Sequence, residues 1–566
     1  METKSKYKFV NYLWDEKKAK EFGDDQVALF LYRSNILGAD LRITNFGGGN
    51  TSCKTIEKDP ITNESVEVMW IKGSGGDIGT LKRDGVAGLY NQRLHDLKKA
   101  YRGLAHEDEM VALFNHCIYD LDSKAPSIDT PLHGLLPFKH IDHLHPDSLI
   151  AIAAAEDSEA ITKEIWGDTM GWVPWQRPGF DLGLQLEACL TKNPSIRGIV
   201  LGSHGVFTWG ETSYESYVNS LEVIETASAY LEKKIAENGS VFGGLKTNSL
   251  SEEDRKSQAA KLAPTLRGMC SSENNMIGHF TDDDVVLEFI NSNDLDRLAP
   301  MGTSCPDHFL RTKIKPLLLD LSADENLEDV ESVISKLSPS FEAYRKDYQS
   351  YYENHKHPNS PAIRDANPVI ILFPGVGMFS FSKNKQTARV AAEFYINAIN
   401  VMRGAEAISK YTSLPYQEAF DIEYWLLEEA KLQRQPKEKS LSRKVALVTG
   451  SGGGIGRAIA DKLIREGSNV IFSDISEEYL KEATSSYTSD QAIGTYCDVT
   501  SKESVEVAIN KASLQFGGLD ILVHSAGLAI SKPIADTTEK DWDLLQDVLV
   551  KGQFLLSQSA AIVFRK

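Results

Sequence analysis

The sequence predicts an α/β chain of several domains, and three observations support this. Helical and strand-like segments alternate from about residue 20 to 235. A glycine, a phenylalanine and a long amphipathic helix occur together twice, at 202–232 and 374–406. From Val445 a strand, a glycine loop and a helix begin another α/β region. With 566 residues, 42% of them hydrophobic and 25% charged, the chain is too long for one core.

The first predicted domain covers residues 1–240. "VALFLYRSNILGAD" has the spacing of an amphipathic helix, and "VEVMWIKGSGG" is a strand that runs into a glycine turn. "IRGIVLGSHGVFTWG" predicts two short strands, and the helix that follows, 213–238, ends before Gly239. The polar stretch "GGLKTNSLSEEDRKSQ" then indicates a domain boundary.

We interpret residues 245–430 as a degenerate second copy of the first domain. "SIDTPLH" precedes the first strand–helix pattern, "SCPDH" precedes the second, and the spacings agree: Ser127 lies 77 residues before His204, and Ser304 lies 72 before Val376. Val376 replaces His204, and this copy has no H-x-H. The alternative is two unrelated α/β pieces with a common strand–helix pattern. A second copy without metal ligands would serve packing or assembly.

Residues 431–443 form a charged, proline-containing linker, and 444–566 form the last predicted domain. The net charge of -19 argues against nucleic acid as a partner. No targeting segment and no run of about 18 apolar residues occurs, so we expect a cytoplasmic protein without a membrane partner. The six cysteines contain no C-x-x-C pair, so any metal must be held by histidine and carboxylate.

"KHIDHLHPDS" raises the possibility of a metal site. On a strand, His143 and His145 project from the same face and can share one ion. His204, at a strand end before a glycine, is the best third ligand. Three imidazoles with an open fourth position suit zinc or another divalent ion. The alternative is a histidine-rich loop that binds nothing. We expect His140 to be a surface residue rather than one that hydrogen-bonds to a metal ligand.

Five segments, in order, resemble the class II aldolase/adducin family between Arg42 and about Glu232: "NFGGGNTS", "IKGSGGD", "PSIDTPLH", "HLH" and "SHGVFTWG". The resemblance implies an α/β/α aldolase-like domain with a metal at His143, His145 and His204. It also implies a substrate-phosphate site made by Gly48, Gly49, Asn50, Ser74, Gly75 and Ser127. The family has a catalytic Glu four residues before a His. Here Asp129 stands four residues before His133, with Asp142 and Glu156 as rivals for the role of acid/base.

The resemblance implies a retro-aldol reaction on a small-molecule sugar phosphate, in which a divalent ion stabilises the enediolate. The order of the domains is similar to that of aldolase–dehydrogenase fusions, which implies L-rhamnulose 1-phosphate as substrate, with dihydroxyacetone phosphate and L-lactaldehyde as products. Epimerases and dehydratases of other ketose phosphates resemble the same motifs. A third alternative is an adducin-like interaction module. The family forms symmetric oligomers, so we expect a homo-oligomer.

The last domain carries a dinucleotide-binding pattern of the Rossmann type. "KVALVTGSGGGIGRAIADKLIREGSNVIFSDIS" gives a strand, a glycine loop, a helix and a second strand that ends at Asp474. Asp474 would bind the ribose hydroxyls and favour NAD over NADP. The spacing resembles the short-chain dehydrogenase/reductase family, with "CDVTS" and "HSAG" as further matches. The predicted cofactor-binding residues are Thr449, Gly450, Ser451, Gly454, Ile455, Gly456, Asp474, Asp498, Val499, Ser525, Ala526 and Gly527.

The catalytic motifs of that family do not follow in this sequence. Only 39 residues come after Gly527, and no Tyr-x-x-x-Lys is among them. Leu549 stands where the family commonly has a catalytic Asn. We therefore expect a truncated dehydrogenase domain, a partial parallel sheet that keeps the NAD half-site but neither oxidises nor reduces a substrate.

Overall fold

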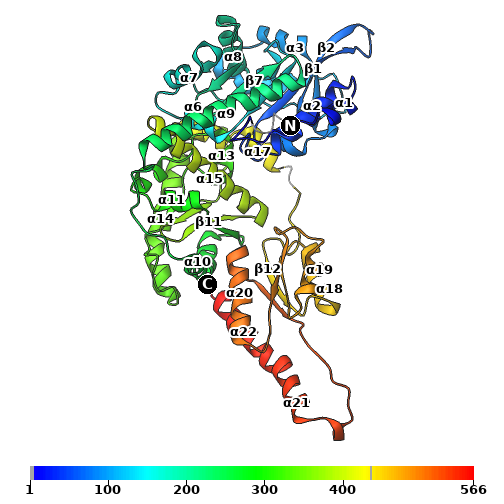
Figure 1. The fold of residues 1–566 in the computed structure, drawn as a ribbon, viewed down its shortest axis with the longest axis vertical. Helices are drawn as coiled ribbons and strands as arrows, with labels where there is room; N and C mark the ends of the chain where they lie inside the picture. Colours follow the sequence, from blue (N-terminus) through cyan, green and yellow to red (C-terminus); the bar gives the residue numbers. More distant parts are fainter. Residues whose placement is uncertain (1–5, 434–435) are drawn as a thin grey trace. The chain divides into compact units, whose positions relative to one another are not determined.

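The computed structural model describes residues 6–433 and 436–566 (Figure 1). Residues 434–435 of the predicted linker and 1–5 of the predicted first domain lie outside the described residues. The chain forms two compact units. Unit 1 contains Met1–Gly243, Thr303–Phe309 and Asn397–Ile422; unit 2 contains Gly244–Gly302, Leu310–Ile396 and Glu423–Lys566. Two pieces of the predicted second copy thus belong to unit 1.

Unit 1 is built on a seven-stranded sheet with the order β3-β2-β1-β4-β7-β6-β5. Its strands are β1 Asn50–Lys58, β2 Ser65–Lys72, β3 Val86–Tyr90, β4 His140–Leu144, β5 Gly171–Val173, β6 Gly198–Leu201 and β7 Gly205–Gly210. The central strand β4 is antiparallel to both neighbours, and His143 pairs with Asn50 on β1 and Phe207 on β7. The register therefore aligns residues from three predicted motifs in one row.

Helices cover both faces of this sheet. On one face, Phe30 of α2 packs with Cys53 and Val68 of the sheet. On the other face, Leu132 of α5 packs with strand residues. The helices of unit 1 up to residue 243 are α1 Glu16–Glu21, α2 Gln26–Gly38, α3 Asn91–Asp96, α4 Glu107–Leu113, α5 Thr130–Gly134, α6 Asp147–Ala153, α7 Ser158–Trp166, α8 Phe180–Lys192 and α9 Ser213–Asn238.

The long helix α9 begins where its sequence predicts. The Thr212 side chain accepts a hydrogen bond from the Glu215 backbone N–H, and the Glu215 side chain accepts one from the Thr212 N–H. This reciprocal cap satisfies two amide groups that a helix N-terminus otherwise leaves unpaired. It fixes the start of α9 directly after β7, which carries the strand partner of His143.

Unit 2 contains a four-stranded sheet with the order β8-β11-β10-β9. Its strands are β8 Ile277–Thr281, β9 Leu317–Leu318, β10 Ile370–Phe373 and β11 Gly377–Ser382. The helices of the predicted second copy are α10 Glu252–Cys270, α11 Asp284–Ile290, α12 Leu295–Leu298, α13 Pro306–Thr312, α14 Val330–His355, α15 Lys385–Ile408, α16 Tyr416–Glu423 and α17 Leu426–Gln433. The start of α13, the second half of α15 and most of α16 belong to unit 1.

The hairpins of the two predicted copies have the same connection. Leu201 pairs with Gly205 across β6 and β7, and Phe373 pairs with Gly377 across β10 and β11. Each pair encloses three residues, and the third is His204 in the first hairpin and Val376 in the second. Val376 is fully buried in an apolar core. The duplication remains an interpretation, supported by this equivalence.

The last region has a four-stranded parallel sheet with the order β14-β13-β12-β15, which confirms the predicted Rossmann-type fold. Its elements are β12 Val445–Thr449, α18 Gly454–Arg465, β13 Asn469–Asp474, α19 Glu477–Thr484, β14 Ala492–Tyr496, α20 Lys502–Phe516, β15 Ile521–His524, α21 Glu539–Gln546 and α22 Gly552–Phe564. Within the described residues β15 is the last strand. No helix in the described part of the chain is long and apolar enough to cross a membrane.

Candidate metal centre and nucleotide site

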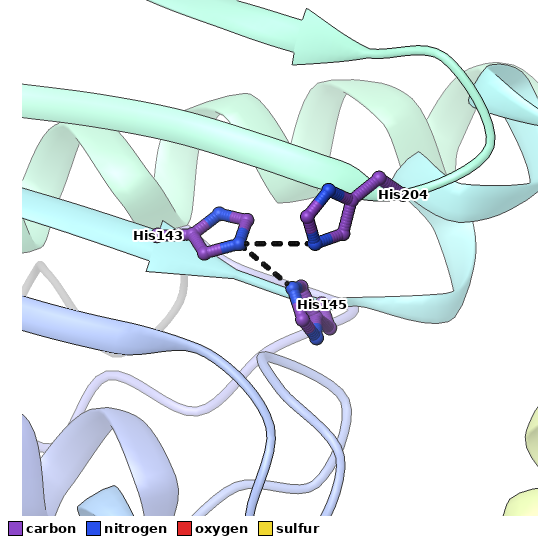
Figure 2. A group of neighbouring side chains, drawn as sticks. All are labelled: His143, His145 and His204. Carbon is purple, nitrogen blue, oxygen red and sulfur yellow. Dashed lines mark hydrogen bonds between the residues drawn. The ribbon is translucent and has the colours of Figure 1, made fainter. Parts of the chain in front are cut away.

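The three predicted histidine ligands converge in unit 1 (Figure 2). His143 Nε2 lies 2.9 Å from His145 Nε2 and 3.3 Å from His204 Nε2. All three side chains are buried. Burial, together with the neighbouring His145, lowers the pKa of His143 to about 4, and burial lowers the pKa of His204 well below its usual value. Three imidazoles whose nitrogens face one point, two of them with a lowered pKa, fit a shared divalent ion.

Each histidine is positioned by a feature of the sheet. His143 lies on β4, stacks on Phe207 with ring centroids 4.3 Å apart, and directs Nδ1 at the carbonyl oxygen of Val206, 3.2 Å away. His145 follows the end of β4. A Cβ on Gly205 would lie 2.7 Å from His145 Cδ2, so the glycine after His204 leaves room for the neighbouring imidazole.

Asp307 joins this cluster, and the sequence reasoning missed it. Its Oδ2 lies 2.5 Å from His145 Nδ1, on the side of the ring away from the other two histidines. Asp307 lies near the start of α13, 162 residues away along the chain. The only sequence signal was the similarity between "SCPDH" and "SIDTPLH", which gave no reason to place Asp307 at the first site.

Asp129 lies beside the histidines, as the candidate acid/base should. Its Oδ2 accepts hydrogen bonds from Asn50 Nδ2 at 3.1 Å and Ser127 Oγ at 3.2 Å. Burial acts to raise the pKa of Asp129, but His143 and the Asn50 amide outweigh it and hold this pKa below its usual value. The carboxylate is therefore ionised at neutral pH and can accept a proton.

His133, four residues after Asp129, lies on the same side of the sheet. Its Nδ1 is 2.8 Å from Ser52 Oγ, and its ring contacts Phe207 edge-on. Burial lowers its pKa well below the usual value. Its Nε2 is buried and has no hydrogen-bond partner among the described residues. A neutral ring at this position can support the Asp129 turn.

The two rivals of Asp129 lie elsewhere. Asp142 projects to the opposite face of β4, where Arg33 Nε is 3.0 Å away and both side chains are fully buried. Glu156 is exposed. Asp129, by contrast, lies close enough to His143 for the two groups to affect each other's charge, and it is hydrogen-bonded to Asn50, the strand partner of His143. Asp129 is therefore the carboxylate that the geometry favours.

The expectation that His140 is a surface residue is wrong. His140 is buried on the Asp142 face of β4, with Nδ1 2.8 Å from the Arg33 guanidinium. Burial and this cation lower the pKa of His140 to about 2. The alternation of strand side chains explains the position, because residue 140 points away from the face that carries 141, 143 and 145. His140 is thus a structural partner of Arg33.

The predicted phosphate residues divide into buried and open groups. Asn50 and Ser127 are buried next to Asp129, Ser74 is half-buried and Gly75 is exposed. Gly49 has φ +71°, and a Cβ there would lie 2.6 Å from the His143 carbonyl oxygen. The glycine loop therefore passes directly against the metal-ligand strand, and Gly48 lies in the same loop.

Two further polar residues near these loops were not predicted. Lys72 is buried at the end of β2 and its Nζ donates to the Gly76 carbonyl oxygen at 3.3 Å. Asn45 is buried before the glycine loop, and its amide has no hydrogen-bond partner within the described residues. A buried cation and a buried unsatisfied amide both suit an anionic ligand. Lys72 could have been identified from the sequence, because it stands at the end of a predicted strand directly before "GSGG".

The predicted nucleotide loop has the geometry that its glycines require. Gly450 has φ +64° and Gly454 has φ +55°. A Cβ on Gly456 would lie 2.2 Å from the Gly450 carbonyl oxygen, so α18 can approach the loop only with glycine there. Asp474 Oδ2 accepts the Gly452 N–H at 3.1 Å. This carboxylate lies beside the loop, where it can bind ribose hydroxyls.

The remaining predicted nucleotide residues gather around the ends of β12 and β15. Thr449 Oγ1 accepts the backbone N–H groups of Ser525 and Ala526, each at 3.2 Å. The Asp498 side chain accepts a hydrogen bond from the backbone N–H of Thr500 and so stabilises the turn in which it lies. Of the other predicted residues, Ser451 is buried and Ile455 is exposed. Val499 lies against Gly552, and Gly527 lies against Leu549.

Comparison with protein families matches three regions of the chain. Residues 31–231 match the class II aldolase and adducin N-terminal domain. Residues 257–432 match the second domain of class II aldolase, and 444–565 match the short-chain dehydrogenase family. The chain therefore joins aldolase-type domains to a dehydrogenase-type domain.

Among curated proteins, the uncharacterized oxidoreductase YuxG of Bacillus subtilis (strain 168) is 38% identical over 555 residues, 97% of this chain and 79% of YuxG. The uncharacterized oxidoreductase SAUSA300_2422 of Staphylococcus aureus (strain USA300) is 41% identical over 120 residues, 21% of this chain. The matched region spans about half of that relative, 52% of its length.

Two solved structures are similar to parts of the chain. The N-terminal class II aldolase domain of a conserved protein from Thermoplasma acidophilum is 27% identical, with a TM-score of 0.34, and the match covers 40% of this chain and 99% of that one. A short-chain dehydrogenase/reductase from Brucella melitensis is 30% identical, with a TM-score of 0.21, over 22% of this chain and 53% of that one.

Proposed function

This chain belongs to the family in which class II aldolase domains are joined to a short-chain dehydrogenase domain, and on that premise we propose that its first domain is a metal-dependent aldolase. The proposed substrate is L-rhamnulose 1-phosphate, cleaved to dihydroxyacetone phosphate and L-lactaldehyde. The observation that carries the proposal is the convergence of three buried imidazoles, two of them with a lowered pKa, next to an ionised carboxylate.

His143, His145 and His204 would hold the ion, zinc or another divalent metal, through their Nε2 atoms. When bound there, the ion polarises the substrate carbonyl and stabilises the negative charge that develops as the carbon–carbon bond breaks. The fit rests on the donors themselves. The Nε2 atoms of His145 and His204 each lie within hydrogen-bond distance of His143 Nε2. Burial lowers the pKa values of His143 and His204, which favours the unprotonated form that a metal needs.

Asp129 would carry the proton transfers. Its carboxylate removes the proton from the C4 hydroxyl as the C3–C4 bond breaks, and L-lactaldehyde leaves with the new C4 carbonyl. The electron pair of the broken bond remains on the C3 side, and return of the proton to C3 gives dihydroxyacetone phosphate. Asn50 and Ser127 orient the carboxylate through hydrogen bonds to Oδ2.

The substrate phosphate would lie between the glycine loop and the "GSGG" loop. The flexible backbone of Gly48, Gly49 and Gly75 permits close approach of N–H groups, and the Ser74 hydroxyl supplies a further donor. Lys72 provides a buried positive charge at the start of the second loop, and the unpaired Asn45 amide offers another donor. A dianionic phosphate satisfies both groups.

The dehydrogenase domain supports an aldehyde-producing reaction in the first domain, because a fused oxidoreductase could use the aldehyde that an aldolase releases. This order of domains resembles that of bifunctional rhamnulose-1-phosphate aldolase/alcohol dehydrogenases. We propose NAD as its cofactor, since the Asp474 carboxylate beside the glycine loop would repel a 2′-phosphate. The proposed substrate of the short-chain dehydrogenase domain is lactaldehyde, and residues 444–566 carry its predicted NAD half-site without the family's Tyr-x-x-x-Lys.

The test is turnover of L-rhamnulose 1-phosphate by purified protein, with dihydroxyacetone phosphate followed by a coupled assay, with and without a chelator. We expect release that the chelator abolishes and added divalent metal restores. His143→Ala should lose it, whereas the matched variant His116→Ala, at an exposed position in the same domain, should keep it. A metal-loaded protein that releases no triose phosphate but isomerises or dehydrates a ketose phosphate would replace the aldolase proposal with an epimerase or dehydratase.

A further inference from the structure

The segment Thr303–Phe309 belongs to unit 1, although it comes from the region matched to the second aldolase domain. It contacts three separate parts of the candidate metal centre. Asp307 meets His145, and the Cys305 thiol donates to the His204 carbonyl oxygen at 3.8 Å. A Cβ on Gly48 would lie 2.6 Å from Asp307 Oδ2, so this carboxylate also lies against the glycine loop.

The hydrogen bond from His145 to Asp307 determines which imidazole nitrogen is free. With Nδ1 as the donor to Asp307, the lone pair of His145 is on Nε2, which faces His143 Nε2. His143 is held in the same way by the weaker neutral contact of Nδ1 with the Val206 carbonyl oxygen, at 3.2 Å. His204 Nδ1 has no hydrogen-bond partner among the residues described. Asp307 is thus the carboxylate that is hydrogen-bonded to an imidazole of this trio.

We propose that Asp307 is a positioning residue for the metal centre, supplied to the first aldolase domain by the second. Its carboxylate fixes the tautomer and the orientation of His145 and makes this imidazole a stronger ligand. The proposal rests on the proposed metal at the three histidines, but not on the identity of the sugar. It also gives the second domain a role at the site of the first, where we had expected only packing or assembly.

The second half of α15 is a further part of that domain that belongs to unit 1. The Asn397 and Asn400 side-chain amides donate to Asp147 Oδ2 at 3.1 and 2.7 Å. Asp147 lies two residues after His145, at the start of α6. Residues from beyond 240 therefore hold both the ring of His145, through Asp307, and the helix that follows it, through α15.

A different reading of the same geometry is a second metal ion held by His145 Nδ1, Cys305 and Asp307, whose ligand atoms lie within 4.8 Å of one another. Two observations favour the hydrogen bond. The Nδ1 to Oδ2 distance of 2.5 Å leaves no room for an ion between these atoms, and Cys305 already donates to a carbonyl. Burial also raises the pKa of the Cys305 thiol well above its usual value, which disfavours the thiolate that a metal needs.

The experiment measures metal binding by the full chain, without substrate. Zn²⁺ affinity is determined by competition with a chromophoric chelator, and the visible spectrum of the Co²⁺ form reports ligand geometry. The variants are Asp307→Ala, Asp307→Asn and Cys305→Ala. The matched control is Asp282→Asn, which removes a partly buried carboxylate paired with Arg255 in the other unit. Thermal unfolding of the metal-free proteins reports any general loss of structure.

We expect Asp307→Ala to weaken Zn²⁺ binding by roughly 10- to 100-fold and to alter the Co²⁺ spectrum, with one ion per chain in the wild type. Asp307→Asn should be intermediate, because its amide oxygen can still accept from Nδ1. Asp282→Asn should bind as the wild type does. Wild-type affinity and spectrum in Asp307→Ala, or two ions per chain that fall to one in Cys305→Ala, would overturn the proposal. Failure of the aldolase assay alone would leave it intact.

Discussion

The side-chain amide of Asn50 lies 3.1 Å from Asp129 Oδ2 and donates a hydrogen bond to it. Asn50 is the first residue of β1 and the strand partner of His143, so one residue joins the glycine loop, the candidate acid/base and the metal-ligand strand. In the proposed mechanism, Asn50 would therefore connect the loop that binds the substrate phosphate to the proton transfer at Asp129. A change at Asn50 should therefore affect both substrate binding and turnover, whereas a change at Asp129 should affect mainly turnover.

Asp129→Asn should lower kcat for triose phosphate release by roughly 10²- to 10⁴-fold, because the amide cannot accept the hydroxyl proton. Zn²⁺ content should remain that of the wild type, since the three imidazoles are untouched. Steady-state kinetics and metal analysis of the same preparations make the comparison. Wild-type turnover in Asp129→Asn would assign the acid/base role to another group.

His143 and His140 lie on opposite faces of β4 and provide a matched pair. His143→Gln should abolish stoichiometric metal binding with little change in the thermal stability of the metal-free protein. His140→Gln should bind metal but unfold at a lower temperature, because it disturbs the buried contact with Arg33. Atomic absorption and thermal denaturation separate the two effects. Equal metal loss in both variants would contradict the two-face arrangement.

The metal-free protein should lose stability as the pH falls from about 6.5 toward 4. The folded pKa is about 4 for His143 and about 2 for His140, both lowered by burial, whereas unfolded histidine titrates near 6.5. Between the folded and unfolded pKa values the unfolded chain binds more protons than the folded chain. Each histidine therefore lowers the free energy of unfolding by about 1.4 kcal/mol for each pH unit that the pH falls in this range. Above about pH 7 this contribution is complete.

Denaturant unfolding of chelator-treated protein at several pH values measures this slope. His140→Gln should show a shallower slope than the wild type, and His116→Ala should follow the wild type because His116 is exposed. A midpoint that does not change between pH 7 and 5 would contradict the buried neutral state of these rings.

Asp474→Ser should shift nucleotide preference toward NADP. The change removes a carboxylate beside Gly452 that would repel a 2′-phosphate and bind ribose hydroxyls. We expect the wild type to bind NAD at least tenfold more tightly than NADP and the variant to reduce this ratio, with equilibrium binding to the full chain as the measurement. Equal affinities for both nucleotides in the wild type would remove Asp474 from this role.

Much of the first site could be predicted because its parts follow local rules. Strand alternation placed His143 and His145 on one side, and the glycine after His204 indicated a turn. The Rossmann-type strand order also followed from the pattern of strand, glycine loop and helix. These features depend on residues near one another in sequence, where backbone geometry alone restricts the outcome.

The contributions of Asp307 and His140 could not be predicted for different reasons. Asp307 reaches His145 across 162 residues, and no periodicity or spacing encodes such a contact. His140 and Asp142 are two residues apart on one strand, so strand alternation predicts that they project from the same face. The burial of His140 could not be predicted, because it depends on Arg33, which lies on a helix 107 residues earlier. Tertiary partners decide whether a polar residue on a strand is exposed or buried.

Unit 1 is assembled from stretches of chain that are far apart in sequence. The backbone N–H of Thr412 donates to the Ala154 carbonyl oxygen at 2.8 Å, and that of Glu156 donates to the Lys410 carbonyl oxygen at 2.9 Å. A gene fragment ended near codon 240 would leave these partners unpaired and would omit Asp307. Unit 1 therefore draws on both aldolase segments, and a transfer of the first segment alone to another gene would carry only part of this unit.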